Sequence, residues 1–132
     1  MKPRLVRAFG PPLLLMGLIF VLSSIPGQVE DGVLGMFTKL DPQWQNLLHI
    51  PLFGGLQFLW LRAFGRIGQV GGKAWLVCLG ITLGYGVLDE LHQLFVPGRY
   101  ASLLDMLLNA LGAVLATMGF WWLVKKNHRT LL

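Results

Sequence analysis

The chain has 132 residues, of which 55% are hydrophobic and 13% are charged, and its formal net charge is +5. Soluble domains carry about 25% charged residues, and a chain this short cannot hide so much apolar surface in a soluble core. The composition therefore excludes an ordinary soluble domain and indicates an integral membrane protein. The single cysteine, Cys78, excludes a disulfide framework or a cysteine metal site.

Four apolar segments follow one another along the chain. A membrane-spanning helix needs about 20 predominantly apolar residues, within a range of about 17–25. The first predicted span opens with Pro11 and Pro12, which are tolerated in a first helical turn. We therefore expect an all-α integral membrane protein, a four-transmembrane-helix bundle in which residues 1–132 form a single domain. The predicted spans are about 9–25, 47–64, 74–95 and 103–124.

Basic residues divide the ends of these spans into two groups. Three lie before the first span, three around the connection between the second and third, and three after the fourth, whereas the other two connections carry one each. Because basic segments stay on the cytoplasmic side, this pattern predicts that both termini are cytoplasmic. All 6 acidic residues then fall in or near the outer half. Membrane topology thus explains the positive charge, and no nucleic-acid partner is expected.

The first outer loop, residues 26–46, carries apolar residues among polar neighbours at a roughly helical spacing. This spacing is compatible with a short interfacial helix lying on the outer leaflet. It is equally compatible with an irregular loop, and both interpretations stay open. The apolar residues are Val29, Val33, Leu34, Phe37 and Leu40.

The end of the third predicted helix carries an unusual density of polar side chains. An ionisable residue in a span costs about 2.5–3.5 kcal/mol at the bilayer centre on insertion scales, and such residues are functional by default. At about 100° per residue, Asp89, His92 and Gln93 share one side of the helix, with His92 at the edge of that arc and Glu90 beside Gln93.

The fourth predicted helix presents a matching polar face. Ser102, Asp105 and Asn109 fall within one arc, and the turn before them is short enough to make the two helices antiparallel neighbours. His49 lies at the outward start of the second helix, and Ser24 lies at the outward end of the first. All four helices therefore offer polar groups at the same depth, on the side predicted to face outward.

Two roles are expected for these groups. Carboxylates and a histidine at a half-buried site suit proton transfer, so the predicted catalytic residues are His49, Asp89, Glu90 and Asp105. Guanidinium, amide and hydroxyl groups suit a phosphate-bearing headgroup, so the predicted substrate-binding residues are Gln93, Arg99, Asn109 and Ser24. The adjacent carboxylates oppose a bare phosphate unless a cation or an ammonium group is bound as well.

Other interpretations of the same residues stay open. The side chains of Asp89, Glu90, His92 and Asp105 are acceptable ligands for Zn²⁺, Mg²⁺ or Mn²⁺. No HExxH or other metal-binding spacing is present, so the sequence predicts no metal site and leaves the cofactor undetermined. In a purely structural interpretation, Arg99 and Asp105 form a salt bridge that holds the turn, and Asn109 hydrogen-bonds between helices.

The stretch 84–112 resembles the VanZ-like family of small bacterial membrane proteins. The family pattern runs approximately G-x-x-D-E-x-x-Q-x-F-x-P-x-R and then D-x-x-x-N-x-x-G. The matching residues are Gly86, Asp89, Glu90, Gln93, Phe95, Pro97, Arg99, Asp105, Asn109 and Gly112. The serine pair that ends with Ser24 and the histidine of the second helix also match, so the resemblance extends from about Leu22 to Gly112. The family commonly has an acid four residues before that histidine, often followed by lysine. This chain has Gln45 and Asn46 at those positions, so the acid is either absent or supplied by Asp41.

The resemblance implies a role in the bacterial cell envelope, because the family is named for a protein that gives low-level teicoplanin resistance. The expected function is to bind or modify an outer-leaflet lipid or a lipid-linked cell-wall precursor headgroup, from a multi-pass position in the cytoplasmic membrane. Whether the protein is an enzyme, and its oligomeric state, are left open. One alternative is a small proton-coupled transporter with a relay through Asp89 and Asp105; another is a structural membrane subunit. Small multidrug transporters carry an essential acid in the first helix, and residues 9–25 contain none.

Overall fold

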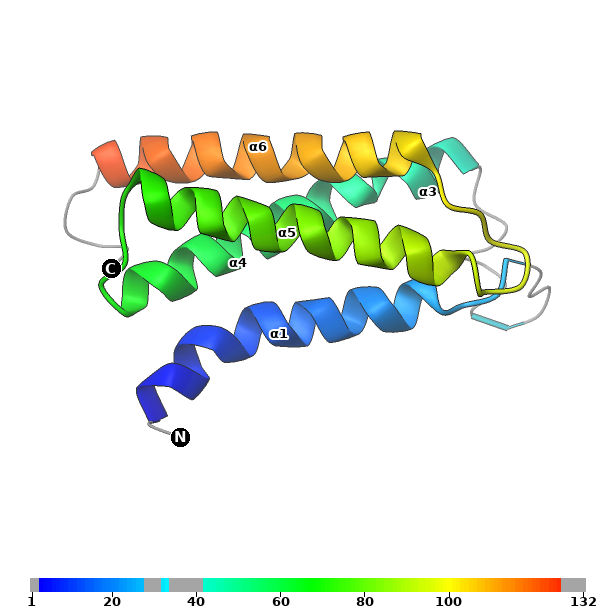
Figure 1. Cartoon of the computed structure of the whole chain (residues 1–132), viewed down its shortest axis with the longest axis horizontal. Helices are drawn as coiled ribbons and strands as arrows, with labels where there is room; N and C mark the ends of the chain where they lie inside the picture. Colours follow the sequence, from blue (N-terminus) through cyan, green and yellow to red (C-terminus); the bar gives the residue numbers. More distant parts are fainter. Residues whose placement is uncertain (1–2, 28–31, 34–41, 127–132) are drawn as a thin grey trace.

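The computed structural model describes residues 3–27, 32–33 and 42–126, and this part of the chain contains helices and no strand. Four long helices run antiparallel in chain order, so that α1 begins and α6 ends at the same end of the bundle (Figure 1). The helices are α1 (Pro3–Ser23), a short α3 (Pro42–Leu47), α4 (His49–Arg66), α5 (Gly72–Gln93) and α6 (Leu103–Lys126).

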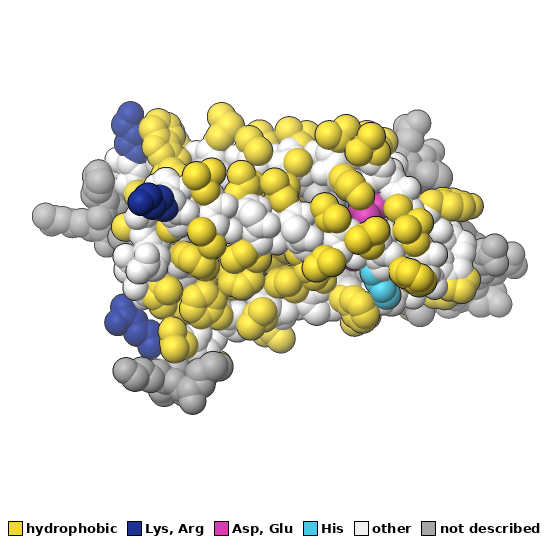
Figure 2. Space-filling view, in the orientation of Figure 1, with side chains coloured by type: hydrophobic (Ala, Val, Ile, Leu, Met, Phe, Trp, Pro, Cys, Tyr) yellow, Lys and Arg dark blue, Asp and Glu magenta, His cyan; other side chains and the backbone are white. Residues whose placement is uncertain are grey.

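The surface of the bundle matches a lipid environment. All 4 long helices are long and apolar enough to cross a membrane, which confirms the predicted number of spans. Hydrophobic side chains cover most of the visible face, Lys and Arg gather at the end where α6 finishes, and Asp, Glu and His lie toward the other end (Figure 2). The predicted interfacial helix falls mostly on residues 28–31 and 34–41, including Asp41, which lie outside the described residues.

Helix α1 begins earlier than predicted, and Pro11 and Pro12 lie inside it. The expectation that they occupy a first turn is therefore wrong. Proline has no backbone N–H, so Pro11 cannot donate to the Arg7 carbonyl four residues earlier. The structure replaces that donor from α4: Arg66 Nη1 donates to the Arg7 carbonyl at 2.8 Å. In return Arg4 Nη2 donates to the Arg66 carbonyl at 2.8 Å, so the start of α1 is joined to the end of α4.

Helices α4 and α6 make the closest helix contact, at two glycines. A Cβ on Gly112 would collide with the Ile50 carbonyl oxygen, and a Cβ on Gly54 would lie 3.1 Å from the Gly112 carbonyl oxygen. Small residues allow transmembrane helices to approach this closely, which increases the van der Waals contact between them. The backbone-to-backbone contact fixes the spacing of the two helices just below the polar end.

The middle of the bundle combines apolar packing with one closed polar network. Phe53, Leu56 and Phe120 are buried among other apolar side chains of the core. Beside them, Thr82 Oγ1 donates to Gln57 Oε1 at 2.7 Å, and Gln57 Nε2 donates to Thr117 Oγ1 at 2.9 Å. The Thr117 hydroxyl donates in turn to the Ala113 carbonyl. Because each donor has a partner, this network joins α4, α5 and α6 with the character of structural helix–helix contacts.

Candidate functional site

The polar residues predicted from the sequence meet at one end of the bundle. His49 is the first residue of α4, while Asp89, Glu90 and Gln93 lie in the last turns of α5. Asp105 and Asn109 lie in the first turns of α6. The antiparallel order of the helices brings these groups to the same level, and Glu90, Asn109, Asp89, Gln93 and Asp105 are all buried.

The first turn of α6 is capped from two directions. The Ser102 hydroxyl accepts the Asp105 backbone N–H at 3.2 Å, as a helix N-cap does. In a capping box, the side chain three residues later would accept the N–H of the cap residue itself. Here Glu90 Oε2, from α5, accepts the Ser102 N–H at 2.7 Å instead. The carboxylate of Asp105 lies toward His49.

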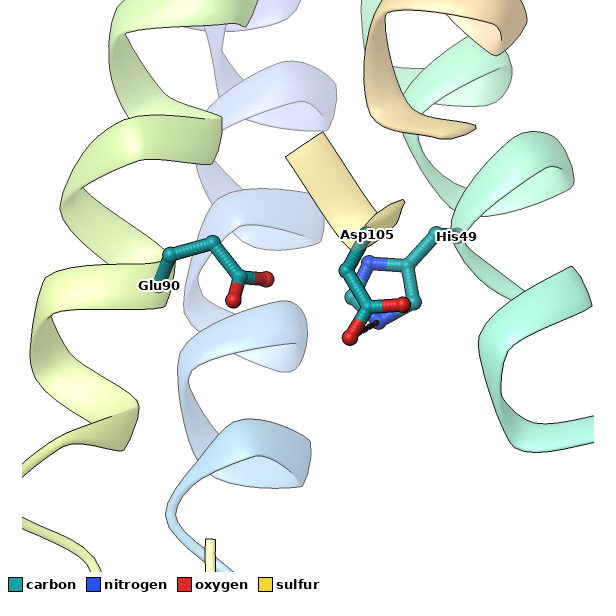
Figure 3. A group of neighbouring side chains, drawn as sticks. All are labelled: His49, Glu90 and Asp105. Carbon is teal, nitrogen blue, oxygen red and sulfur yellow. Dashed lines mark ion pairs between the residues drawn. The ribbon is translucent and has the colours of Figure 1, made fainter. Parts of the chain in front are cut away.

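His49, Glu90 and Asp105 form a three-residue cluster, called the His–Glu–Asp cluster below, in which both carboxylates are buried and His49 is partly exposed (Figure 3). His49 Nε2 lies 3.8 Å from Asp105 Oδ2, and one ligand-type atom from each of the three residues lies within 4.8 Å of the others. His49 Nδ1 is 2.8 Å from Asn109 Oδ1. Since an amide oxygen only accepts, the Nδ1 atom donates, and Nε2 is the ring nitrogen that faces Asp105.

A cavity of about 140 Å³ adjoins this cluster and is lined by both polar and apolar side chains. His49 belongs to both the cavity wall and the cluster, so it joins the two. The polar lining residues are Ser23, Gln45, His49, Asp89, Gln93 and Arg99. The apolar lining residues are Ile19, Leu22, Ile25, Leu48, Leu52 and Phe53.

Asp89 and Arg99 give the cavity both signs of charge. Asp89 is 4% exposed; its Oδ2 accepts from Gln93 Nε2 at 3.3 Å, and its Oδ1 is buried without a hydrogen bond to the described residues. Arg99 donates through Nε to the Ile25 carbonyl at 3.1 Å. Asp105 Oδ2 lies 3.8 Å from His49 Nε2, and the expected Arg99–Asp105 salt bridge stays a prediction. The guanidinium is thus held at the cavity by the backbone that follows α1.

Ser24 and His92 join α1 to α5 beside the cavity. The Ser24 hydroxyl donates to the Phe20 carbonyl at 2.6 Å and lies 2.9 Å from His92 Nε2, which therefore donates to it. The His92 ring also packs on Phe20 with ring centroids 4.5 Å apart. The Ser24 hydroxyl is engaged in these contacts, whereas Ser23 lines the cavity. Substrate binding by Ser24 stays a prediction.

The turn between α5 and α6 closes this end against the segment after α1. Gly27 donates its N–H to the Pro97 carbonyl at 3.0 Å, and a Cβ on Gly27 would collide with the Gly98 carbonyl oxygen. Gly98 has φ of 75°, a left-handed conformation that glycine adopts readily. The Arg99 N–H donates to the Val96 carbonyl, which confirms the predicted turn.

Three site features were missed by the sequence analysis. Ser23 and Gln45 line the cavity, but neither was predicted as a binding residue. Tyr85 donates its hydroxyl to the Met16 carbonyl at 2.6 Å and holds α1 against α5. The Ser23–Ser24 pair indicated that one of the two serines faces the site. Which serine lines the cavity depends on how the last turn of α1 is rotated about its axis, and the sequence does not give that rotation.

Comparison with known proteins gives a family match. A family model described as VanZ/LLP1 matches residues 11–125, which is most of the chain and includes every residue of the cluster and the cavity. Searches of curated proteins and of solved structures give no significant match.

Proposed function

We propose that this chain, which belongs to the VanZ/LLP1 family, binds the headgroup of a lipid or of a lipid-linked cell-wall precursor at the outer leaflet of the bacterial cytoplasmic membrane. One observation carries the proposal: the cavity is lined by the Arg99 guanidinium, by an apolar wall and by Asp89, whose Oδ1 has no hydrogen-bond partner among the described residues. The charge pattern of the sequence supports an outward position for that end, because the basic residues concentrate at the opposite one.

The two charges favour a headgroup that carries both a phosphate and an ammonium group. A guanidinium forms charge-assisted hydrogen bonds with phosphate oxygens, and a carboxylate oxygen accepts from an ammonium. Binding pockets for whole drug-sized ligands measure about 300–1,000 Å³. A cavity of about 140 Å³ therefore suits one headgroup fragment rather than a sugar chain. The apolar wall suits the first methylenes of the attached chain. A link to teicoplanin resistance would follow if the headgroup belongs to a cell-wall precursor.

Two observations weigh on the alternatives. A purely structural cluster would have its buried polar atoms paired, as those around Gln57 are. Four side-chain polar atoms are buried without hydrogen-bond partners among the described residues, and three of them gather at the site: Asp89 Oδ1, Glu90 Oε1 and Asn109 Nδ2; the fourth, Trp60 Nε1, lies in the core. A proton-coupled transporter would need a relay that continues to the other end, and the acidic side chains that the structure describes all lie at the cavity end. Proton flux across liposomes that contain the protein tests this alternative directly.

The proposal is tested by lipid binding to the purified protein in detergent, measured by native mass spectrometry. The probes are phosphatidylethanolamine, phosphatidylglycerol and a polyprenyl diphosphate, which separate a zwitterionic phospholipid from an anionic one and from a precursor carrier. Asp89→Asn is expected to remove the preference for the ammonium-bearing lipid. Arg99→Gln is expected to weaken binding of all three by about tenfold, the equivalent of about 1.4 kcal/mol.

Arg62→Gln is the matched control, because Arg62 is an exposed arginine on α4 away from the cavity. This variant is expected to bind all three lipids like the wild type. Wild-type binding in both Asp89→Asn and Arg99→Gln would overturn the proposal. A preference for the polyprenyl diphosphate would identify the precursor carrier as the source of the headgroup.

A further inference from the structure

The His–Glu–Asp cluster collects three side chains of metal-ligand type from three different helices. The imidazole comes from the start of α4, one carboxylate from the end of α5 and the other from the start of α6. Tetrahedral ligands with bonds of about 2.0–2.2 Å lie roughly 3.3–3.6 Å apart. The atoms of the cluster lie within 4.8 Å of one another, with His49 Nε2 and Asp105 Oδ2 at 3.8 Å. Small side-chain rotations would bring them to that spacing.

One of these groups is buried with an unused acceptor. Glu90 is 0% exposed, and its Oε2 is held by the Ser102 N–H, but its Oε1 has no hydrogen-bond partner among the described residues. The Glu90 carboxylate points toward Asp105 and His49 (Figure 3). A buried polar atom without a partner is costly, and native structures usually supply one as a protein group, a water or an ion.

We propose that His49, Glu90 and Asp105 bind one divalent transition-metal ion of the Zn²⁺ or Mn²⁺ class. Two carboxylates supply two negative charges, which one such ion neutralises inside the bundle. The imidazole favours a transition metal over Mg²⁺ or Ca²⁺, which prefer ligand sets made of oxygen atoms. The inference departs from the sequence-based expectation of no metal site and does not depend on which lipid the cavity binds.

Two neighbours hold the ligands as the outer shell of a metal site does. A histidine that binds a metal usually donates its other ring N–H to a carbonyl or carboxylate, and ligating carboxylates are themselves hydrogen-bonded. Asn109 Oδ1 accepts from His49 Nδ1, which leaves Nε2 for the ion. The Ser102 N–H holds Glu90 Oε2, which leaves Oε1 for the ion. Three protein ligands also match zinc sites that keep a further position for water or substrate.

Metal titration of the purified protein tests this site. The protein carries no histidine tag, is stripped with a chelator in detergent, and is titrated calorimetrically with ZnCl₂, MnCl₂ and MgCl₂. We expect one Zn²⁺ or Mn²⁺ per chain and much weaker Mg²⁺ binding. His49→Gln, Glu90→Gln and Asp105→Asn are each expected to weaken binding by at least about 100-fold, and Asn109→Ala by about 10- to 100-fold.

Two matched controls separate the cluster from its surroundings. His92→Gln removes the described histidine that lies outside the cluster, and it is expected to leave the affinity unchanged. Asp89→Asn removes a neighbouring carboxylate that is not a proposed ligand, so it is expected to weaken binding far less than any of the three ligand variants. Absence of stoichiometric binding by the wild type, an unchanged affinity in the three ligand variants, or an equal loss in Asp89→Asn would overturn the assignment.

A second measurement uses only the wild-type protein, so its result does not depend on whether a variant folds. The chelator-stripped wild type is loaded with Co²⁺ and with Zn²⁺ and studied by optical and X-ray absorption spectroscopy. We expect a first shell of one imidazole nitrogen and several oxygens. A sulfur ligand would place the ion at Cys78, which is buried in the second turn of α5, and would overturn the proposal.

Discussion

Glu90 of α5 accepts the backbone N–H of Ser102 at 2.7 Å, so that a carboxylate from one helix caps the start of the next. The N–H groups of a first helical turn have no partners within the helix and must find them elsewhere. Since Glu90 supplies one, the end of α5 and the start of α6 form a single unit. Glu90 also belongs to the His–Glu–Asp cluster, so one side chain takes part in both the cap and the cluster.

Two substitutions of Glu90 are expected to separate these roles. Glu90→Gln keeps an oxygen that accepts the Ser102 N–H, so it should preserve most of the stability while it loses the proposed metal affinity. Glu90→Leu removes the acceptor and is expected to lower the free energy of unfolding by about 1–3 kcal/mol. Thermal unfolding in detergent with a chelator present measures the difference. Equal stability of the two variants would contradict the capping role.

The contact between α4 and α6 predicts an asymmetry between two glycines of the same helix. Gly112→Ala would push a methyl group into the Ile50 carbonyl, with an expected loss of about 1–3 kcal/mol in unfolding free energy. Gly119→Ala is the matched control, because a Cβ there meets nothing within 4 Å. It is expected to be neutral or to stabilise by up to about 1 kcal/mol. Unfolding in mixed micelles checks both, and similar values for the two would be evidence against the close approach.

Ser24 and His92 are expected to act as a coupled structural pair. Ser24→Ala and His92→Ala should each lower stability, and the double variant should lose less than the sum, because both remove the same hydrogen bond. A coupling energy of about 0.5–1.5 kcal/mol is typical of hydrogen bonds between transmembrane helices. A double-mutant cycle in detergent measures it. Additive losses, together with weakened lipid binding by Ser24→Ala alone, would instead favour the predicted binding role.

The orientation of the bundle is testable by cysteine labelling in a Cys78→Ala background. Tyr100→Cys lies at the cavity end and Gln69→Cys at the opposite end, and both positions are exposed. If the cavity faces outward, a membrane-impermeant maleimide labels Tyr100→Cys in spheroplasts and labels Gln69→Cys only after lysis. The reverse pattern would place the cavity in the cytoplasm and contradict the positive-inside prediction.

Hydropathy predicted the four long helices, and the spacing of polar residues at about 100° per residue predicted that they lie at one end of the bundle. Both predictions depend only on local sequence, and the antiparallel order follows from the short connections. The first span was the least well predicted, because Pro11 and Pro12 are normally helix-breaking and the arginine that replaces the donor missing at Pro11 comes from the distant α4. The spacing of residues along the chain could not predict the contact between Arg66 and the Arg7 carbonyl.

The detailed roles within the site depend on how neighbouring helices are rotated against each other. His49 and Asn109 are 60 residues apart, and their hydrogen bond exists only because two glycines let α4 and α6 approach. The sequence pattern predicted no metal site because metal motifs place several ligands on one element. In the His–Glu–Asp cluster each ligand comes from a separate helix, so no spacing along the chain reveals it.

The glycine contacts also decide how the His–Glu–Asp cluster could close around an occupant. His49, Asp105 and Asn109 belong to α4 and α6, whose backbones are already in contact just below them. Glu90 belongs to α5, where a Cβ on Gly86 would lie 3.1 Å from Asn109 Nδ2 and 3.2 Å from Phe53 Cε1. Since all three helices are held at close spacing, an occupant draws the ligands together by rotating their side chains, and the helix backbones keep their places.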